Sequence, residues 1–212
     1  MGKYTTKGLY NGYDKNHKER DKTDYYATPT NEVINILKTL NIDLNNQVIL
    51  EPCAGGGHMV NGILDYAPKA IVYATDFSKH KSVTGHIIST GKEYDFLADN
   101  YEMPTSDIDW IIMNPPFKTI EPFLIRSLEI AEKGVIMFAR LQFLEGQHRY
   151  ESILKEKPFT DMYVYVDRIQ CWKDGVEPEG SSAQAYAWFV WNKEKENNDP
   201  INITCRHLIV IC

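Results

Sequence analysis

Short apolar runs that alternate with helix-like segments dominate the sequence. The runs that predict strands are VIL (48–50), AIVYAT (70–75), EYDFL (93–97), DWIIM (109–113), GVIMFA (134–139), DMYVYV (161–166) and AYAWFVW (185–191). The segments that predict helices are 30–40, 58–66, 78–89 and 120–132. Thr30, which follows Thr28-Pro29, is the expected cap of the first helix. Strands alternating with helices predict an α/β domain with a mostly parallel sheet.

Three segments fall outside this alternation. Residues 1–23 are polar and aperiodic, so we expect an arm that is ordered only against the body or a ligand. Residues 167–183 contain Gly, Pro, Ser and charges, which favours a long surface loop of the kind that often carries function. Residues 201–211 are a candidate edge strand. A chain of 212 residues suits one compact domain, which we expect over 24–212.

Composition excludes several classes of protein. With 43% hydrophobic and 25% charged residues, the chain is typical of globular proteins. No apolar run approaches the roughly 20 residues that span a bilayer, and the N-terminus lacks the apolar stretch of a secretory signal. We therefore expect a cytoplasmic protein, in a bacterium or a phage-infected host cell, without a membrane partner. The cysteines show no metal-ligand spacing, so we expect reduced thiols and no metal: Cys53, Cys171, Cys205 and Cys212.

The charge distribution bears on nucleic-acid binding. A net charge of −6 disfavours a protein that binds nucleic acid over its whole surface. A local basic track remains open, because basic residues cluster over 15–22 and over 79–81. The alternative for either cluster is a solvated surface.

A glycine-rich loop follows the first predicted strand, in the sequence Glu51-Pro52-Cys53-Ala54-Gly55-Gly56-Gly57. Loops at the carboxyl ends of strands bind ligands in doubly wound sheets, and glycine lets backbone approach a ligand closely. The spacing is G-x-G without the third glycine of a dinucleotide fingerprint, and no G-K-[ST] follows. The loop therefore disfavours an NAD-dependent oxidoreductase and a P-loop.

Acidic residues end the next two predicted strands. Asp76 stands where a carboxylate accepts hydrogen bonds from ribose hydroxyls, and its alternative role is a helix N-cap. Phe77 is suited to pack on an adenine face. Asp95-Phe96 would complete a nucleoside pocket, with the carboxylate accepting from an adenine amino group. Together with the glycine loop, these residues predict a nucleoside-containing cofactor.

The motif Asn114-Pro115-Pro116-Phe117 follows the fourth predicted strand and carries the chemistry. The prolines restrain the turn, so that the Asn114 side-chain oxygen and the Pro115 carbonyl point in set directions. Two adjacent acceptors suit a single –NH2 group, which presents two donors. Accepting both N–H bonds moves the delocalised lone pair toward a methyl group and stabilises the charge that develops on nitrogen. Phe117 would stack on the planar target. The alternative is a plain strand-ending turn.

These motifs together resemble class I S-adenosylmethionine-dependent methyltransferases, specifically the N6-adenine DNA methyltransferases with a [DNS]PP[YFW] motif. The resemblance covers about residues 24 to 192, and the segments 140–150 and 185–191 are similar to small phage-encoded members. It implies a Rossmann-like fold with strand order 3-2-1-4-5-7-6, the last strand antiparallel. It implies S-adenosylmethionine as cofactor and DNA as partner. The segment Tyr25-Tyr26-Ala27-Thr28-Pro29 resembles the Y-x-T-P segment that contacts the cofactor's methionine end.

Carried over by position, the resemblance implies the following roles. The catalytic residues would be Asn114, Pro115, Pro116 and Phe117. The cofactor-binding residues would be Tyr26, Thr28, Pro29, Glu51, Pro52, Ala54, Gly55, Gly57, Asp76, Phe77, Asp95 and Phe96. The substrate-binding residues would be Phe117, Lys118 and Arg140. Four residues are candidates for phosphate contacts, with surface solvation as the alternative: Arg140, Arg149, Arg168 and Lys173.

Two departures from the family pattern affect these expectations. His58-Met59 follows the glycines where phenylalanine is commoner, so packing at the methyl end would differ. We expect no separate target-recognition domain, so sequence reading on DNA would be short or relaxed. NPPF-type motifs also serve enzymes that methylate glutamine amides in proteins or amines of RNA bases. A non-catalytic scaffold that keeps the fold is the alternative from another class.

Overall fold

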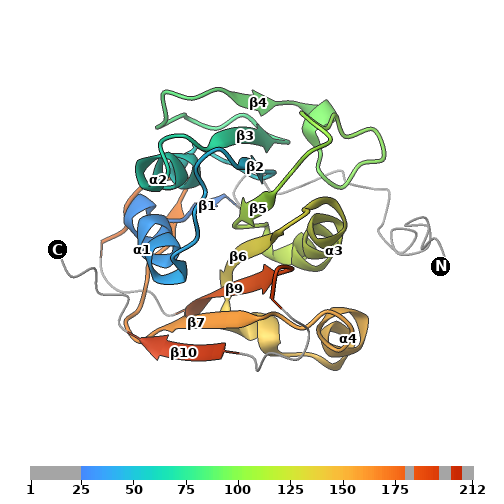
Figure 1. Cartoon of the computed structure of the whole chain (residues 1–212). Helices are drawn as coiled ribbons and strands as arrows, with labels where there is room; N and C mark the ends of the chain where they lie inside the picture. Colours follow the sequence, from blue (N-terminus) through green and yellow to red (C-terminus); the bar gives the residue numbers. More distant parts are fainter. Residues whose placement is uncertain (1–24, 180–183, 196–201, 207–212) are drawn as a thin grey trace.

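The computed structural model describes residues 25–179, 184–195 and 202–206. A sheet with the order β10-β7-β9-β6-β5-β2-β3-β4 forms its centre (Figure 1). The strands are β1 Tyr26–Ala27, β2 Val48–Glu51, β3 Ile71–Asp76, β4 Ile88–Thr90, β5 Trp110–Met113, β6 Gly134–Arg140, β7 Asp161–Tyr165, β8 Trp172–Lys173, β9 Tyr186–Asn192 and β10 Asn202–Arg206. The α-helices are α1 Thr30–Leu40, α2 His58–Tyr66, α3 Ile120–Ile130 and α4 Gln147–Arg149.

The strand order confirms the predicted Rossmann-like arrangement. Strands β4-β3-β2-β5-β6-β9-β7 lie in the order 3-2-1-4-5-7-6. The strands from β4 to β6 pair in parallel, and β9 runs antiparallel to both β6 and β7. Beyond β7, β10 adds a parallel edge strand, as the tail's sequence predicts. The predicted arm over 1–23 lies outside the described residues.

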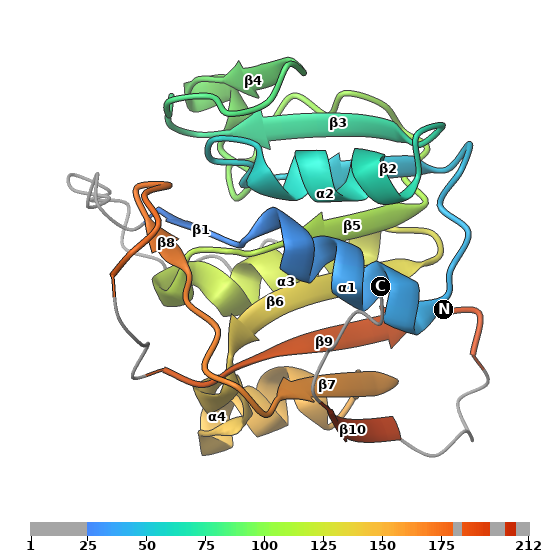
Figure 2. The same ribbon diagram turned by 90° about the vertical axis from the view of Figure 1, so that its left-hand side faces the viewer.

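The central strands are buried on both faces, which explains why their sequences are continuously apolar. Along β5, Trp110 and Ile112 belong to one core cluster, whereas Ile111 and Met113 belong to the other. Helices α1 and α2 cover the first face, and α3 and α4 lie on the opposite face (Figures 1 and 2). This three-layer arrangement leaves the strand ends and their loops to form the site.

One helix prediction fails in its cap. Thr30 is the first residue of α1 rather than its cap, and Pro29 occupies the cap position without a side-chain hydrogen bond. The Thr30 hydroxyl donates instead to the carbonyl of His58, at 3.1 Å. The Thr30 hydroxyl is therefore used in a tertiary contact with α2, rather than at the N-terminus of α1 as the local sequence predicts.

The predictions for 78–89 and 93–97 are wrong. Residues 78–87 form an irregular loop with bends, strand 3 of the order is β4, and Lys92–Tyr94 is a single 3-10 turn. Ser82 and Thr84 hydroxyls bond to neighbouring backbone groups, which competes with helix formation. The Val83 amide donates to the Gly56 carbonyl at 2.9 Å, so the segment is held against the glycine loop.

The segment 167–183 is a loop only in part. Within it, β8 pairs antiparallel with β1, with Tyr26 opposite Lys173 and Ala27 opposite Trp172. We call residues 25–28 and 172–175 together the β1–β8 strap. Figure 2 shows the strap beside the arrowhead of β5, where the parallel strands end.

Candidate active site

The glycine loop, residues 52–57, links β2 to α2 at the carboxyl edge of the sheet. Gly55 and Gly57 have φ values of +54° and +92°, a region that side chains resist. The Ala54 amide donates to the Thr75 carbonyl at 3.0 Å, which anchors the loop to β3. A Cβ on Gly55 would lie 2.1 Å from the Tyr25 ring, so glycine is required both for backbone conformation and for close approach.

Asp76 lies at the end of β3, directly beside this loop. Its Oδ2 accepts from the Gly55 amide at 2.8 Å, and its Oδ1 accepts from the Ser78 amide at 2.7 Å. It is not a helix cap, because no helix follows it. A carboxylate has about four lone-pair sites, so two backbone bonds leave room for further donors. The structure thus brings Asp76 and the glycine loop together, and half-buried Phe77 follows at the same edge.

Glu51 ends β2 beneath the loop and is the most unusual acid of the site. Its side chain is 3% exposed, and Oε2 has no hydrogen-bond partner among the described residues. Burial raises the Glu51 pKa well above its usual value, and the charge of Asp76 raises it further. A buried acceptor without a donor is costly in a native protein. Its position therefore indicates a place where a ligand donates.

Asp95 and Phe96 separate in role. The Phe96 ring is 1% exposed and packs at 5.3 Å from Tyr101 and 5.1 Å from Phe123, between ring centroids. This ring belongs to the core, and a contact of Phe96 with a cofactor stays a prediction. The Asp95 carboxylate accepts from the Leu97 amide at 3.2 Å and is half-buried. A cofactor contact by Asp95 stays a prediction.

The NPPF turn, residues 114–117, begins where β5 ends. The Asn114 Nδ2 donates to the Tyr26 carbonyl at 2.8 Å and to the Thr28 hydroxyl at 3.0 Å. A backbone carbonyl only accepts, so the amide nitrogen has to face Tyr26, and this fixes the orientation of the side chain. Nothing in the described part of the chain donates to Oδ1. Asn114 thus keeps an acceptor oxygen, as its sequence motif predicts.

The NPPF turn also contacts the glycine loop directly. The Cys53 thiol donates to the Asn114 carbonyl at 3.4 Å. The two motifs are 61 residues apart in the sequence, but parallel β2 and β5 bring their ends together. One sheet edge therefore holds a ligand-type loop and the oriented side-chain acceptor of Asn114 side by side.

Arg140 packs against Phe117, and its expected contact with a substrate or phosphate stays a prediction. Its guanidinium carbon lies 3.9 Å from the centroid of the Phe117 ring, and its Nε is buried without a partner among the described residues. The Tyr26 ring lies 5.8 Å from Phe117, tilted by 40°. Arg140 therefore packs within the site as the cationic cover of one face of Phe117. Lys118 is exposed next to it, and a substrate contact there stays a prediction.

Behind Arg140, Cys171 and Tyr186 make a buried polar group. Burial raises the pKa of Cys171 to about 12, against a smaller opposing effect of its hydrogen bond to Tyr186. Burial likewise raises the pKa of Tyr186 far above its usual value. Tyr186 also hydrogen-bonds Arg140, so it helps to hold the guanidinium in place.

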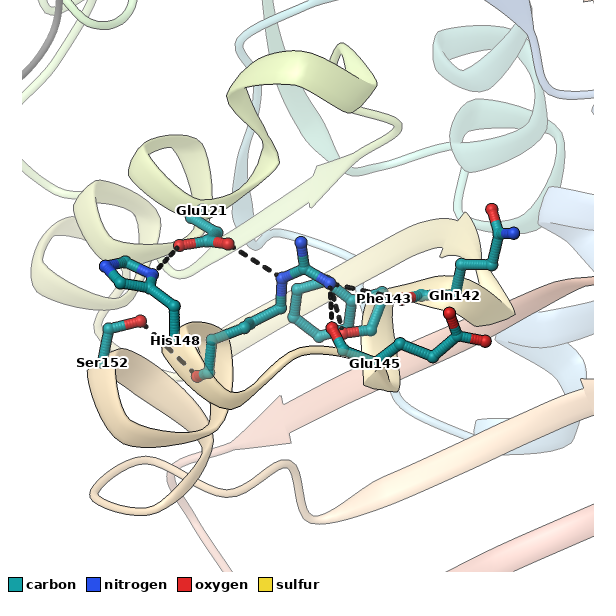
Figure 3. Close-up of polar contacts among 7 residues, drawn as sticks. Glu121, Gln142, Phe143, Glu145, His148 and Ser152 are labelled. Carbon is teal, nitrogen blue, oxygen red and sulfur yellow. Dashed lines mark hydrogen bonds and ion pairs between the residues drawn. The ribbon is translucent and has the colours of Figure 1, made fainter.

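Arg149 is not available for a phosphate. Its Nη1 donates to the carbonyls of Gln142, Phe143 and Glu145 at 3.2, 2.8 and 2.9 Å. Its Nε pairs with Glu121 at 3.0 Å, and Figure 3 shows Glu121 also facing His148. The arginine ties the 142–145 turn to α3, so the expected phosphate contact is corrected. Arg168 and Lys173 stay predictions.

The sequence reading missed the aromatic residues that cover the glycine loop. The Tyr25 hydroxyl accepts from the Gly56 amide at 2.8 Å and lies 3.1 Å from His58 Nδ1. The centroid of the His80 ring lies 4.4 Å from that of Tyr25, with the rings tilted by 39°, and Trp172 meets His58 edge-on at 5.4 Å. Burial raises the Tyr25 pKa to about 12 and lowers that of His58. Only two signals existed in the sequence: the aromatic residue before Y-x-T-P and the unusual His58.

Other kinds of site are not seen in the described residues. Within 25–179, 184–195 and 202–206, no three His, Cys, Asp or Glu side chains gather as metal ligands would. Among those same residues, no helix is both long and apolar enough to cross a membrane.

Comparison with known proteins relates the fold to methyltransferases. No protein-family model matches the sequence, and a search of curated proteins finds no significant match. Among solved structures, a type I restriction-modification methyltransferase subunit from Streptococcus thermophilus has a TM-score of 0.59 at 11% identity, over 81% of this chain. A protein described as an RNA methyltransferase from Pyrococcus horikoshii gives 0.56 at 19% over 79%, and a predicted O-methyltransferase from Agrobacterium tumefaciens gives 0.55 at 16% over 82%.

These similarities extend over different shares of the other proteins. This chain covers 46% of the restriction-modification subunit, so it spans about half that length. It covers 85% of each of the other two proteins. The chain has the Rossmann-like fold of methyltransferases that are described for different substrates.

Proposed function

We propose that the protein transfers a methyl group from S-adenosylmethionine to the exocyclic N6 amino group of adenine in DNA. The observation that carries this proposal is the contact between the Cys53 thiol and the Asn114 carbonyl, at 3.4 Å. It joins a nucleoside-type loop to a turn that presents acceptors for an –NH2 group. Methyl transfer between two bound molecules requires this proximity.

The residues around the glycine loop fit S-adenosylmethionine. That cofactor presents an ammonium group, ribose hydroxyls and an adenine amine, all of which donate hydrogen bonds. The unpartnered Oε2 of Glu51 is suited to a donor, and Asp76 has acceptor capacity left beside Gly55. Without a side chain, Gly55 and Gly57 allow backbone to lie close to the ligand. Tyr26 and Thr28 belong to the strap, Pro29 follows them at the cap of α1, and Pro52 and Ala54 belong to the loop itself.

The chemistry of the target lies with the NPPF turn. S-adenosylmethionine supplies, when bound, a methyl group on a positively charged sulfur. Asn114 Oδ1 and the Pro115 carbonyl accept the two N–H bonds of the target amine, which concentrates the lone pair on nitrogen. They also stabilise the positive charge that nitrogen gains as its bond to carbon forms. The bond that breaks would be the cofactor's sulfur–methyl bond, whose electron pair stays on sulfur. The methylated nitrogen then loses a proton to water, so no strong base is needed before attack.

The packing around Phe117 limits how a target enters. Arg140 covers one face of the ring at 3.9 Å. A planar base therefore stacks on a face or edge that Arg140 leaves open. Adenine in a duplex has to be rotated out of the stack before its amine reaches Asn114.

Two features support DNA over the other –NH2 substrates. The Y-x-T-P segment before the glycine loop resembles the N6-adenine enzymes, and it contacts Asn114 through Tyr26 and Thr28. One structural neighbour is described as the methyltransferase subunit of a type I restriction-modification system. The net charge of −6 favours a protein glutamine somewhat, which makes that amide the second candidate.

The test is incubation with methyl-labelled S-adenosylmethionine and, separately, unmethylated duplex DNA, RNA and a cell protein extract. We expect label in DNA, recovered as N6-methyladenine by mass spectrometry, and none with Asn114→Ala. Asn45→Ala, on an exposed loop before β2, is the matched control and should keep full transfer. Label in protein or RNA would contradict DNA as the substrate and assign the methyl transfer to that acceptor instead. Cofactor binding without transfer to any substrate would favour a scaffold, and binding of NADH instead would refute the cofactor.

A further inference from the structure

The Asn114 side chain is held by hydrogen bonds that come from a distant part of the sequence. Both hydrogens of its amide are used, one by the Tyr26 carbonyl and one by the Thr28 hydroxyl, across 88 and 86 residues. Thr28 is 2% exposed, so its oxygen is shielded from water that would otherwise replace it. The amide is thus oriented by the protein before any substrate arrives.

Tyr26 is itself fixed by the β1–β8 strap. Alternate carbonyls of a strand point to opposite sides. The Tyr25 carbonyl accepts from the Asp174 amide at 2.9 Å on the β8 side, whereas the Tyr26 carbonyl accepts from Asn114 on the other. The two-residue strand β1 therefore connects the 172–175 loop to the catalytic amide.

Orientation matters because the two ends of an amide have opposite hydrogen-bonding roles. With Nδ2 toward Tyr26 and Thr28, Oδ1 is the atom left to accept from a target amine. A rotated amide would present N–H groups to the N–H groups of the target and could not stabilise its growing positive charge. The Tyr26 carbonyl excludes that rotated state because it can only accept, and the Thr28 hydroxyl adds a second hydrogen bond that holds the amide in place.

We propose that Thr28 is a positioning residue for catalysis, whose hydroxyl, with the strap-held Tyr26 carbonyl, fixes Asn114 with Oδ1 directed at the target amine. This inference rests on the proposed function, since Asn114 is taken as the acceptor of that amine. It gives Thr28 a role other than the cofactor contact expected from its motif. The role also explains why the chain needs asparagine here: an aspartate would set a carboxylate oxygen against the Tyr26 carbonyl.

Thr28→Val tests the proposal because valine keeps the branched shape and removes the acceptor. Loss of one neutral hydrogen bond predicts about a three- to tenfold lower kcat. KM for the methyl acceptor and Kd for S-adenosylmethionine should stay near the wild-type values, and Thr28→Ser should restore kcat. Thr39→Val is the matched control, since that exposed hydroxyl bonds only the Asn35 carbonyl of its own helix. In an Asn114→Ala background, Thr28→Val should have no further effect on kcat.

A spectroscopic readout separates this proposal from the proposed function. The NMR signal of the Asn114 side-chain amide is identified by its loss in Asn114→Ala. Its chemical shift should change in Thr28→Val and return to the wild-type value in Thr28→Ser. An unchanged signal, or weakened cofactor binding with unchanged kcat, would overturn the positioning role while leaving methyl transfer intact. A shifted signal in a protein that methylates nothing would support the orientation of Asn114 and refute the proposed function.

Discussion

The glycine loop and the NPPF turn meet at one sheet edge, but they are built in different ways. In the glycine loop the backbone supplies the shape, and the acids Glu51 and Asp76 lie beneath and beside it. In the NPPF turn a side-chain amide supplies the chemistry, and prolines together with the β1–β8 strap hold it in place. The glycine loop offers acceptors to the donors of a cofactor, whereas the NPPF turn offers acceptors to the donors of a target amine.

The difference indicates that the two regions contribute to different kinetic quantities. Interactions with a whole cofactor act equally in the ground and transition states, so they set affinity. Acceptors for a developing charge act mainly in the transition state, so they set kcat. Substitutions on either side should therefore separate Kd from kcat.

The largest effect is expected at the NPPF turn. Asn114→Ala removes an oriented acceptor and should lower kcat by about 100- to 1000-fold, as loss of a comparable transition-state donor or acceptor does. Kd for S-adenosylmethionine, measured by calorimetry, should stay near wild type. A variant that kept its kcat, or lost cofactor binding as well, would remove the distinction between the two regions.

A smaller effect of the opposite kind is expected at Asp76. Asp76→Ala removes a charged acceptor that also holds the Gly55 amide, so Kd for the cofactor should rise about 10- to 100-fold. The kcat at saturating cofactor should change little. Asp43→Ala is the matched control, because that exposed carboxylate also accepts from a backbone amide, at Asn45. A fall in kcat at saturating cofactor would contradict this assignment and indicate that Asp76 acts in the transition state, as Asn114 does.

The smallest effect is a pH dependence of stability that arises from Glu51. Its folded pKa is raised, so ionisation costs more in the folded than in the unfolded state. The cost is absent below the usual pKa of 4.5 and grows as pH rises from there toward the folded pKa. Glu51→Gln should therefore unfold at a higher temperature than wild type, by a margin that widens with rising pH. Thermal unfolding across this range measures it, and a margin that narrows would contradict the assignment.

Much of this architecture could be predicted because the signals are local. The β5 sequence WIIM is apolar on both faces, and the NPPF turn that follows carries its own restraints. By contrast, 78–89 has helical spacing, but Ser82 and Thr84 satisfy the backbone locally instead. Val83 and Ile87 are exposed in the structure, and Ile88 packs against the core as part of β4, so no core contact favours a helix.

The remaining site features depend on contacts that no local pattern encodes. Arg140 and Arg149 look alike in the sequence, yet one covers Phe117 and the other binds three carbonyls. The hydrogen bonds of Arg149 depend on the 142–145 turn and on Glu121 of α3, which no local pattern around the arginine indicates. Tyr25 was missed for the same reason, since its partners Gly56 and His58 lie about 30 residues away.

The pairing of β1 with β8 has a consequence for how the backbone opens. Asn114 follows β5, whose amides lie between two cores and should exchange with solvent only when the whole protein unfolds. Its amide orientation comes from β1, which pairs with β8 through two residues only. Amide hydrogen exchange should therefore be slow up to Met113 and fast at Tyr26 and Trp172. The catalytic side chain would then follow a strand that exchanges slowly, while its orientation depends on a strand pairing that opens often.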